Sequence, residues 1–164
     1  VAPSGSCAGM IKRHYPEVLK NDPGALALAA KTHELTSFLV NIRGMKAVTA
    51  KCEARACYHD SCSSLREMKV REQPRQLLAS VEGLSISELT DGDICCGFGG
   101  LFSVKYPEIS ERMADDKIAD ATTTDADMLL GGDLGCLLHL DGRMSRQGKT
   151  MRVRHVAEVL ADGT

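Results

Sequence analysis

The chain has 164 residues, 43% hydrophobic and 26% charged, which is enough to bury the core of one domain or slightly more. Its net charge of −2, with no basic stripe interleaved with aromatic residues, gives no support to nucleic-acid binding. We see no signal peptide and no apolar run near the roughly 18 residues of a membrane span. Seven cysteines without the dense spacing of a secreted disulfide scaffold indicate a cytoplasmic protein.

The first part of the chain is predicted to be mainly helical. Residues 1–10 read as the end of a strand, a turn of small residues and a helix start. A helix over 11–19 should break or restart at Pro16. Residues 22–32 begin with the Asp-Pro pair that is typical of a helix start, and 33–40 form a further short helix. Because the chain starts inside an element and without Met, we expect a fragment or a processed chain.

From residue 47 onward strands and helices should alternate. The predicted strands are 47–59, 84–89, 128–130 and 151–153. The predicted helices are 65–81 with a break at Pro74, 107–123, one that carries Cys136, and 155–160. Such alternation predicts an α/β fold, in which a parallel sheet is flanked by helices.

Two adjacent thiols, Cys95 and Cys96, stand at the head of a glycine-rich loop between a predicted strand and a predicted helix. Neighbouring cysteines rarely form a disulfide with each other, because the trans peptide between them holds the sulfurs badly. They can ligate two metals of one cluster. Gly97 and Gly99 would let backbone N–H groups approach the sulfurs, so we treat both glycines as candidate cofactor-binding residues.

Two further cysteines frame this pair, in the pattern Cys62-x32-Cys95-Cys96-x39-Cys136. All four fall where a predicted strand is followed by a helix, the edge at which open α/β sheets place their sites. We therefore expect the four thiols to converge on a metal. The alternative is four inert cysteines that pack as small hydrophobic residues.

Other candidates near these thiols keep open roles. Cys52 and Cys57 should lie on opposite faces of an extended strand, so at least one belongs to the core. His59 is more often a turn or supporting residue than a ligand, and His139 either binds metal, hydrogen-bonds a ligand sulfur or packs on the helix surface. Basic side chains that would offset thiolate charge, or else be simply solvated, are Arg66, Lys69 and Lys105.

A weak internal repeat is also visible. Residues 4–10 resemble 133–139 in their position before a helix, and 32–35 have a counterpart in 155–160. We predict that 1–46 is the C-terminal remainder of a first repeat and that 47–164 is a second, complete one. Cys7 would be the last thiol of the first site; the alternative is a lone cysteine with coincidental neighbours.

Four stretches resemble a known family: Tyr58–Cys62, Cys95–Gly100, the Pro107–Ser110 helix start with Lys117, and Asp133–His139. They are similar to the cysteine-rich CCG domain of heterodisulfide reductase B subunits, glycolate oxidase iron–sulfur subunits and the lactate utilisation protein A family. The likeness to the last of these covers essentially the whole chain.

This resemblance implies a cytoplasmic protein with two such domains that binds iron–sulfur clusters through its cysteines. It implies Cys62, Cys95, Cys96 and Cys136 as ligands of a 4Fe–4S cluster. The heterodisulfide reductase pattern ends in Cys-x-x-Cys, whereas this chain has His139 at the last position. The loss of a fifth thiolate argues against the non-cubane cluster of those reductases, while four thiolates suffice for a cubane.

The expected function is therefore electron transfer in a complex that oxidises L-lactate, or a related 2-hydroxy acid, to the keto acid. The implied partners are other subunits of a lactate or glycolate oxidation complex, including a ferredoxin-type iron–sulfur protein, and the chain would not be a stand-alone catalyst. One alternative is a zinc-binding structural or interaction module. The other is a thiol–disulfide reductase that acts at Cys95 and Cys96.

Overall fold

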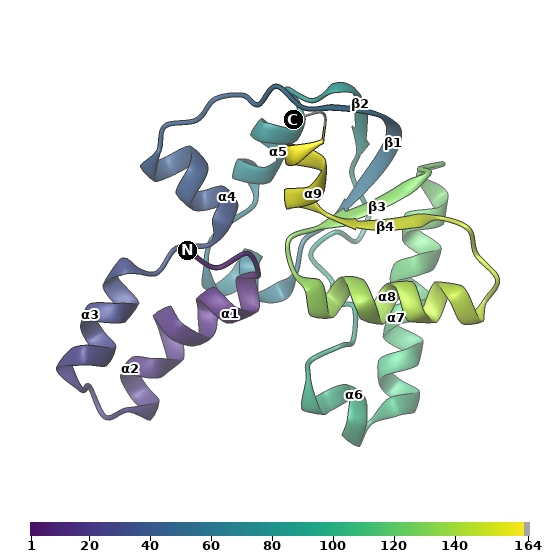
Figure 1. Ribbon diagram of the computed structural model, residues 1–164. Coiled ribbons are helices and arrows are strands. Elements are labelled where there is room, and N and C mark those ends of the chain that lie inside the picture. The colour runs from purple at the N-terminus through teal and green to yellow at the C-terminus, as the bar shows by residue number, and fades with distance from the viewer. Residues whose placement is uncertain (163–164) are drawn as a thin grey trace.

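The computed structural model describes residues 1–162 and contains a four-stranded parallel sheet in the order β2-β1-β3-β4 (Figure 1). The strands are β1 (Lys51–His59), β2 (Glu82–Ser87), β3 (Met128–Gly131) and β4 (Arg152–His155). β1 pairs with both β2 and β3, and β3 pairs with β4, always in parallel. The predicted α/β fold with a parallel sheet is confirmed, and all four strands lie where the sequence placed them to within a few residues.

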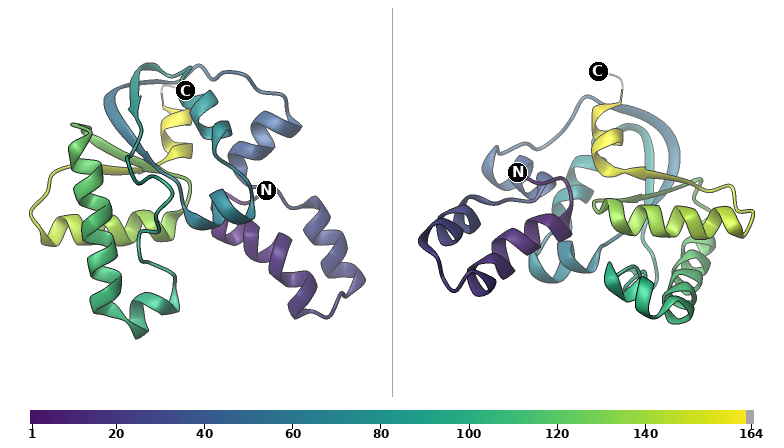
Figure 2. Two further views of the ribbon diagram at one scale, coloured as in Figure 1. Left: turned by 180° about the vertical axis from the view of Figure 1, so that it is seen from behind. Right: turned by 60° about the horizontal axis from the view of Figure 1, so that its bottom comes forward.

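Helices cover both faces of this sheet (Figures 1 and 2). On one face lie α5 (Glu72–Leu78) and α9 (Val156–Ala161), which pack on a buried cluster that includes Tyr58. On the other lie α7 (Pro107–Thr123) and α8 (Leu134–Arg146), whose cluster includes Cys57. Successive residues of β1 thus enter different halves of the core, as the period of a strand requires.

The N-terminal helices lie beside the sheet (Figure 2). They are α1 (Gly5–Gly9), the π-helical turn η1 (Met10–His14), α2 (Tyr15–Val18), α3 (Pro23–Lys31), α4 (Leu35–Ser37) and the π-helical turn η2 (Phe38–Ile42). The predicted start of α3 is confirmed, because Asp22 Oδ1 accepts hydrogen bonds from the N–H groups of Gly24 and Ala25 at 2.8 and 3.1 Å.

Of the two outcomes expected at Pro16, a break or a restart of the helix, the structure shows the restart, because α2 begins at Tyr15. Residues 5–18 are helical throughout, with the π-helical turn η1 directly before the proline. Pro16 lies in the first turn of α2, directly after the π-helical turn η1. The regular α-helical hydrogen bonds are already interrupted at this point, so the N–H group that proline lacks is not missed.

The helical segment predicted over 65–81 is broken, but the predicted position of the break, Pro74, is wrong. The structure has a π-helical turn, η3 (Ser63–Glu67), then a break with Lys69 at φ +57°, and only then α5. Pro74 does not interrupt a helix, because it lies in the first turn of α5, where a proline removes no helical hydrogen bond.

A short helix, α6 (Leu101–Lys105), follows the cysteine pair. None of the helices in residues 1–162 is long and apolar enough to cross a membrane.

The two proposed repeats have matching backbone contacts. Ala2 forms a parallel bridge with Glu34, the N-cap of α4, and Gly131 pairs in parallel with His155, the N-cap of α9. Ala2 and Gly131 each precede a cysteine by five positions along the chain. This correspondence favours the division into 1–46 and 47–164, which stays a prediction.

Candidate metal centre

The cysteines predicted as ligands lie at the carboxyl ends of three neighbouring strands. Cys62 follows β1 and is the N-cap of η3, while Cys95 and Cys96 are in the loop after β2. Cys136 is in the first turn of α8, directly after β3. Because β1 lies between β2 and β3 and all three are parallel, their ends meet at one edge of the sheet.

The four thiols form a continuous row at this edge. Cys62 hydrogen-bonds Cys95, and Cys96 interacts with both Cys95 and Cys136. Hydrogen bonding to Cys95, together with burial, raises the pKa of the Cys62 thiol. Hydrogen bonding to Cys136 is the main reason that the pKa of Cys96 rises to about 12, against the opposite effect of Cys95. Thiols packed in this way ionise together only when a cation lies among them.

A histidine joins the inner end of the row. His59, the last residue of β1, is 1% exposed, and its ligating nitrogen lies within 4.8 Å of the sulfurs of Cys96 and Cys136. Neither ring nitrogen has a hydrogen-bond partner among residues 1–162. Burial, helped by the charge of Lys117, lowers the pKa of His59 to about 4, so the ring is neutral at physiological pH.

The glycine-rich loop brings backbone N–H groups to two of the sulfurs. Gly97 has φ +88°, and its N–H donates to Cys95 Sγ at 3.4 Å. The backbone of Phe98 hydrogen-bonds the Cys96 thiol. Gly99, at φ +49°, shapes the loop, and its predicted part in cofactor binding stays a prediction.

Behind the loop, Ser110 and His139 form a support. Ser110 Oγ donates to the carbonyl oxygen of Gly97 at 2.9 Å and lies 3.3 Å from His139 Nε2. The His139 ring also packs at an angle against Phe98, with the ring centroids 5.9 Å apart. Of the roles that the sequence left open for His139, these contacts favour a packing residue that supports the loop.

One buried cation acts on the site. Lys117 of α7 is 2% exposed, donates to the carbonyl oxygen of Asp91, and acts electrostatically on His59 and Cys96. Arg66 donates to a backbone carbonyl at 3.0 Å and acts on Cys62 from the surface. The other two basic residues considered from the sequence are exposed: Lys69 and Lys105.

The remaining cysteines lie outside the row. Cys57 is fully buried in the core between β1 and the pair α7 and α8, where burial raises the pKa of its thiol. Cys52 packs partly buried against the opposite cluster. Their predicted placement on opposite faces is confirmed. Cys7 is exposed.

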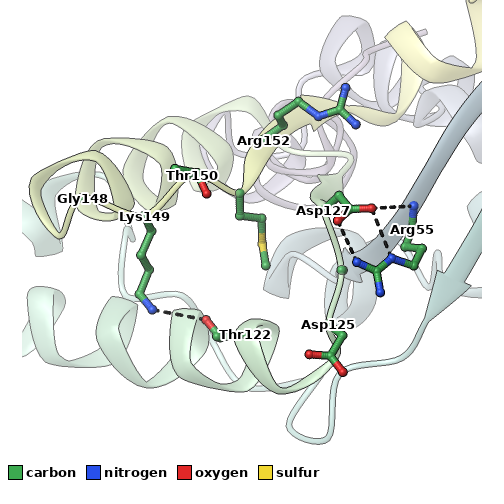
Figure 3. A pocket seen from close by; sticks show the side chains of 10 residues that line it. Arg55, Thr122, Asp125, Asp127, Gly148, Lys149, Thr150 and Arg152 are labelled. Atoms are coloured by element: carbon green, nitrogen blue, oxygen red, sulfur yellow. Dashed lines mark hydrogen bonds and ion pairs between the residues drawn. The ribbon is translucent and has the colours of Figure 1, made fainter.

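A hollow of about 580 Å³ lies away from the thiols, where the chain enters β3 and β4 (Figure 3). Within it, Arg55 binds Asp127 at 2.9 Å and Lys149 donates to Thr122 Oγ1 at 3.4 Å. The hollow contains none of the candidate ligands, so we do not assign it to the centre. Its lining residues are Arg55, Thr122, Asp125, Ala126, Asp127, Gly148, Lys149, Thr150, Met151 and Arg152.

The donor atoms of the four thiols and of His59, which together we call the thiol edge, suit a metal. Thiolates and a neutral imidazole are soft to intermediate ligands of the kind that iron–sulfur clusters and zinc take. Unpaired nitrogens on a buried ring are unfavourable unless something binds them. The residues at this edge therefore fit a metal or iron–sulfur centre on chemical grounds.

Comparisons with known proteins agree with this chemistry. The family described as "CCG: Cysteine-rich domain" matches residues 56–141. "Lactate utilization protein A 2" of Bacillus cereus (strain AH820) is 47% identical over 167 residues, covering 99% of this chain and 69% of the relative. "Lactate utilization protein A" of Geobacillus sp. (strain WCH70) is 49% identical over 164 residues, covering 98% and 68%.

Proposed function

Since this chain belongs to the cysteine-rich domain (CCG) family and to the family of lactate utilization protein A, we propose that it is an iron–sulfur subunit of an oxidoreductase complex that acts on L-lactate or a related 2-hydroxy acid. The observation that carries this proposal is the row of four thiols at the ends of β1, β2 and β3. Cysteines separated by more than 30 positions in the sequence meet there.

The residues that would hold a 4Fe–4S cluster are Cys62, Cys95, Cys96 and Cys136. Four thiolates suffice for a cubane, and such a cluster supplies one-electron transfer when bound. The N–H groups of Gly97 and Phe98 point at sulfur, where hydrogen bonds stabilise negative charge. The buried amino group of Lys117 acts electrostatically on Cys96, although burial lowers the pKa of Lys117 itself.

Two of the four thiols are accessible to possible partners. Cys62 and Cys95 are half-buried, whereas Cys96 and Cys136 are buried. Electrons would therefore enter and leave on the Cys62 side, to and from other subunits, including a ferredoxin-type iron–sulfur protein. Bond-making chemistry on the 2-hydroxy acid would belong to a partner subunit. The seven free thiols suit the reducing cytoplasm.

Anaerobic preparation and reconstitution with iron and sulfide test the proposal. We expect iron and acid-labile sulfide in equal amounts, a brown colour, and an electron paramagnetic resonance signal on reduction. Cys62→Ser and Cys136→Ser should lose most of the iron, whereas Cys52→Ser, which alters a thiol outside the row, should keep it. Wild-type protein that takes up iron without sulfide, or neither, would contradict the proposal.

A zinc site is the second candidate, because His59, Cys96 and Cys136 alone offer three ligands for one ion. Colourless protein that retains stoichiometric zinc after anaerobic preparation would favour it. A thiol–disulfide reductase is less favoured, since the raised pKa of Cys96 leaves little of the reactive thiolate.

A further inference from the structure

We propose that His59 is a protein ligand of the centre and binds a metal through a ring nitrogen, beside the thiolates of Cys96 and Cys136. The inference deepens the proposed function and rests on it, because it adds a donor to the same site. Neither the four-cysteine pattern nor the spacing of the motifs requires this histidine.

The position of His59 follows from the register of β1. Cys57 points into the cluster below α7 and α8, and residues two apart in a strand share a face. His59 therefore points to the same side as Cys57, at the end of the strand, where Cys96 and Cys136 also lie. Its pairing with Gly131 of β3 places it beside the turn that leads to Cys136.

The distances suit a shared metal. Metal–sulfur bonds of about 2.3 Å and metal–nitrogen bonds of about 2.0 Å put two ligands of one ion within about 4.6 Å of each other. The donor atoms of His59, Cys96 and Cys136 all lie within 4.8 Å of one another, so small side-chain rotations suffice.

The unpaired nitrogens of His59 point to the same conclusion. A buried imidazole normally hydrogen-bonds at one nitrogen at least. His155, also at a strand end, accepts a hydrogen bond from the N–H of Ala157 at 3.1 Å, and His139 contacts Ser110. His59 has no such partner at either nitrogen within the described residues, and it is more deeply buried than His139. A metal bond would satisfy one nitrogen in a place where water has little access.

An imidazole binds a metal through the lone pair of its unprotonated ring nitrogen. With His59 the chain offers five donors, so one metal of a cluster can carry two protein ligands without displacement of any of the four thiolates.

Pulsed electron paramagnetic resonance on the reduced, anaerobically reconstituted protein gives a direct test. We expect a nitrogen hyperfine coupling that changes when histidine alone is labelled with ¹⁵N. The coupling should disappear in His59→Leu and persist in His139→Leu, a control that removes the ring packed against Phe98. A wild-type cluster without a coupling sensitive to the label, or a coupling retained in His59→Leu, overturns the assignment.

Cobalt(II) titration of the metal-free protein is the second measurement, and it does not depend on cluster assembly. We expect thiolate-to-cobalt absorption bands in the wild type and an affinity lower by at least about tenfold in His59→Leu and His59→Asn, with an altered visible spectrum. Equal affinity and an unchanged spectrum in both variants, with circular dichroism showing that they are folded, would overturn the proposal.

The two measurements separate the two claims. A cluster that assembles without histidine coupling leaves the proposed function standing and removes His59 from it. Protein that binds cobalt in a manner dependent on His59, yet takes up no sulfide, keeps the histidine ligand and contradicts the iron–sulfur function.

Discussion

Gly97 shows how much the thiol edge depends on a single residue. Its φ of +88° is in the left-handed region, and a Cβ atom there would lie 2.6 Å from the carbonyl oxygen of Ser110 and 2.8 Å from Cβ of Met113. Any side chain would push the loop away from α7 and draw the N–H of Gly97 off Cys95. Gly148 has a similar φ of +67°, but a Cβ atom there would have nothing within 4 Å.

We predict that Gly97→Ala lowers the free energy of unfolding by about 2 to 4 kcal/mol, because backbone strain and overpacking add. Metal uptake should fall as well, since the loop carries both adjacent thiols. Gly148→Ala has the backbone strain alone and should cost about 1 kcal/mol. Denaturant unfolding of the two variants provides the comparison, and equal losses would refute the crowding argument.

Among the secondary-structure elements, Arg75 of α5 ties two strand ends together. Its guanidinium group binds both oxygens of Asp60, at 3.0 and 2.7 Å, and both oxygens of Glu88, each at 2.7 Å. It also lies over the ring of Tyr58, 5.2 Å from the centroid. Asp60 leads from β1 to Cys62, and Glu88 follows β2 on the way to Cys95, so this clamp sets the distance between the two loops.

Arg75→Ala should destabilise the fold by about 3 to 5 kcal/mol, because it leaves the buried carboxylate of Asp60 without its partner. Arg112, which makes an exposed pair with Asp116 one helical turn away, is the control, and Arg112→Ala should change stability by less than about 0.5 kcal/mol. Thermal and urea unfolding would measure both. Similar small losses in the two variants would show that the clamp is no more than a surface ion pair.

Helices α1 and α8 cap each other. The N–H of Ser6 in α1 donates to Asp133 Oδ2 at 2.8 Å, and the N–H of Leu134 in α8 donates to Ser4 Oγ at 3.3 Å. Ser4 and Asp133 are the N-caps of their own helices and correspond to each other in the proposed repeat. This exchange joins the N-terminal segment to the sheet domain next to Cys136.

Asp133→Ala should therefore cost about 1 to 2 kcal/mol, since it removes the acceptor and a negative charge from the start of α1. Hydrogen exchange at the amide of Ser6 should become faster in the same variant. Ser6→Ala keeps the backbone donor and removes only an exposed side chain, so it should leave both quantities nearly unchanged. If Ser6→Ala has the larger effect, the cap is not what holds the two segments together.

Over the whole molecule, arginine–carboxylate pairs connect elements that are distant in the sequence. Arg143 of α8 binds Asp115 of α7 at 2.6 Å, and Arg55 of β1 binds Asp127 before β3 at 2.9 Å. These guanidinium groups hold the pKa of each carboxyl below its usual range. The pKa values of two further carboxyls are lowered in the same way, by Arg75 and Arg154: Glu88 and Asp162.

This pattern predicts loss of stability in acid. A carboxyl group whose pKa is lower in the folded than in the unfolded chain stabilises the fold when ionised. The contribution is complete above the ordinary carboxyl pKa of about 4 and disappears as the pH falls through the lower folded-state values. Urea midpoints should therefore be level near neutral pH and fall steadily below about pH 4. Asp115→Asn should be less stable at neutral pH and show a shallower acid transition, and an unchanged profile would contradict this account.

Local patterns were enough to predict most of the individual elements. Alternation of strand-like and helical stretches predicted a parallel α/β sheet, and the Asp-Pro pair predicted the start of α3. The error at Pro74 came from reading proline as a break inside a helix. A proline in the first turn of a helix costs no hydrogen bond, and the sequence does not show where a π-helical turn begins.

For the candidate centre, the sequence by itself determined which thiols to expect, because Cys62, the adjacent pair and Cys136 all follow strands. Only the tertiary structure decided that β1 lies between β2 and β3, so that these thiols meet, and that His59 and Lys117 are buried among them. The spacing of residues along a chain does not specify which strands become neighbours. Burial depends on helices α7 and α8, contributed from far along the chain, so a histidine that reads from the sequence as a turn or supporting residue can become part of the site.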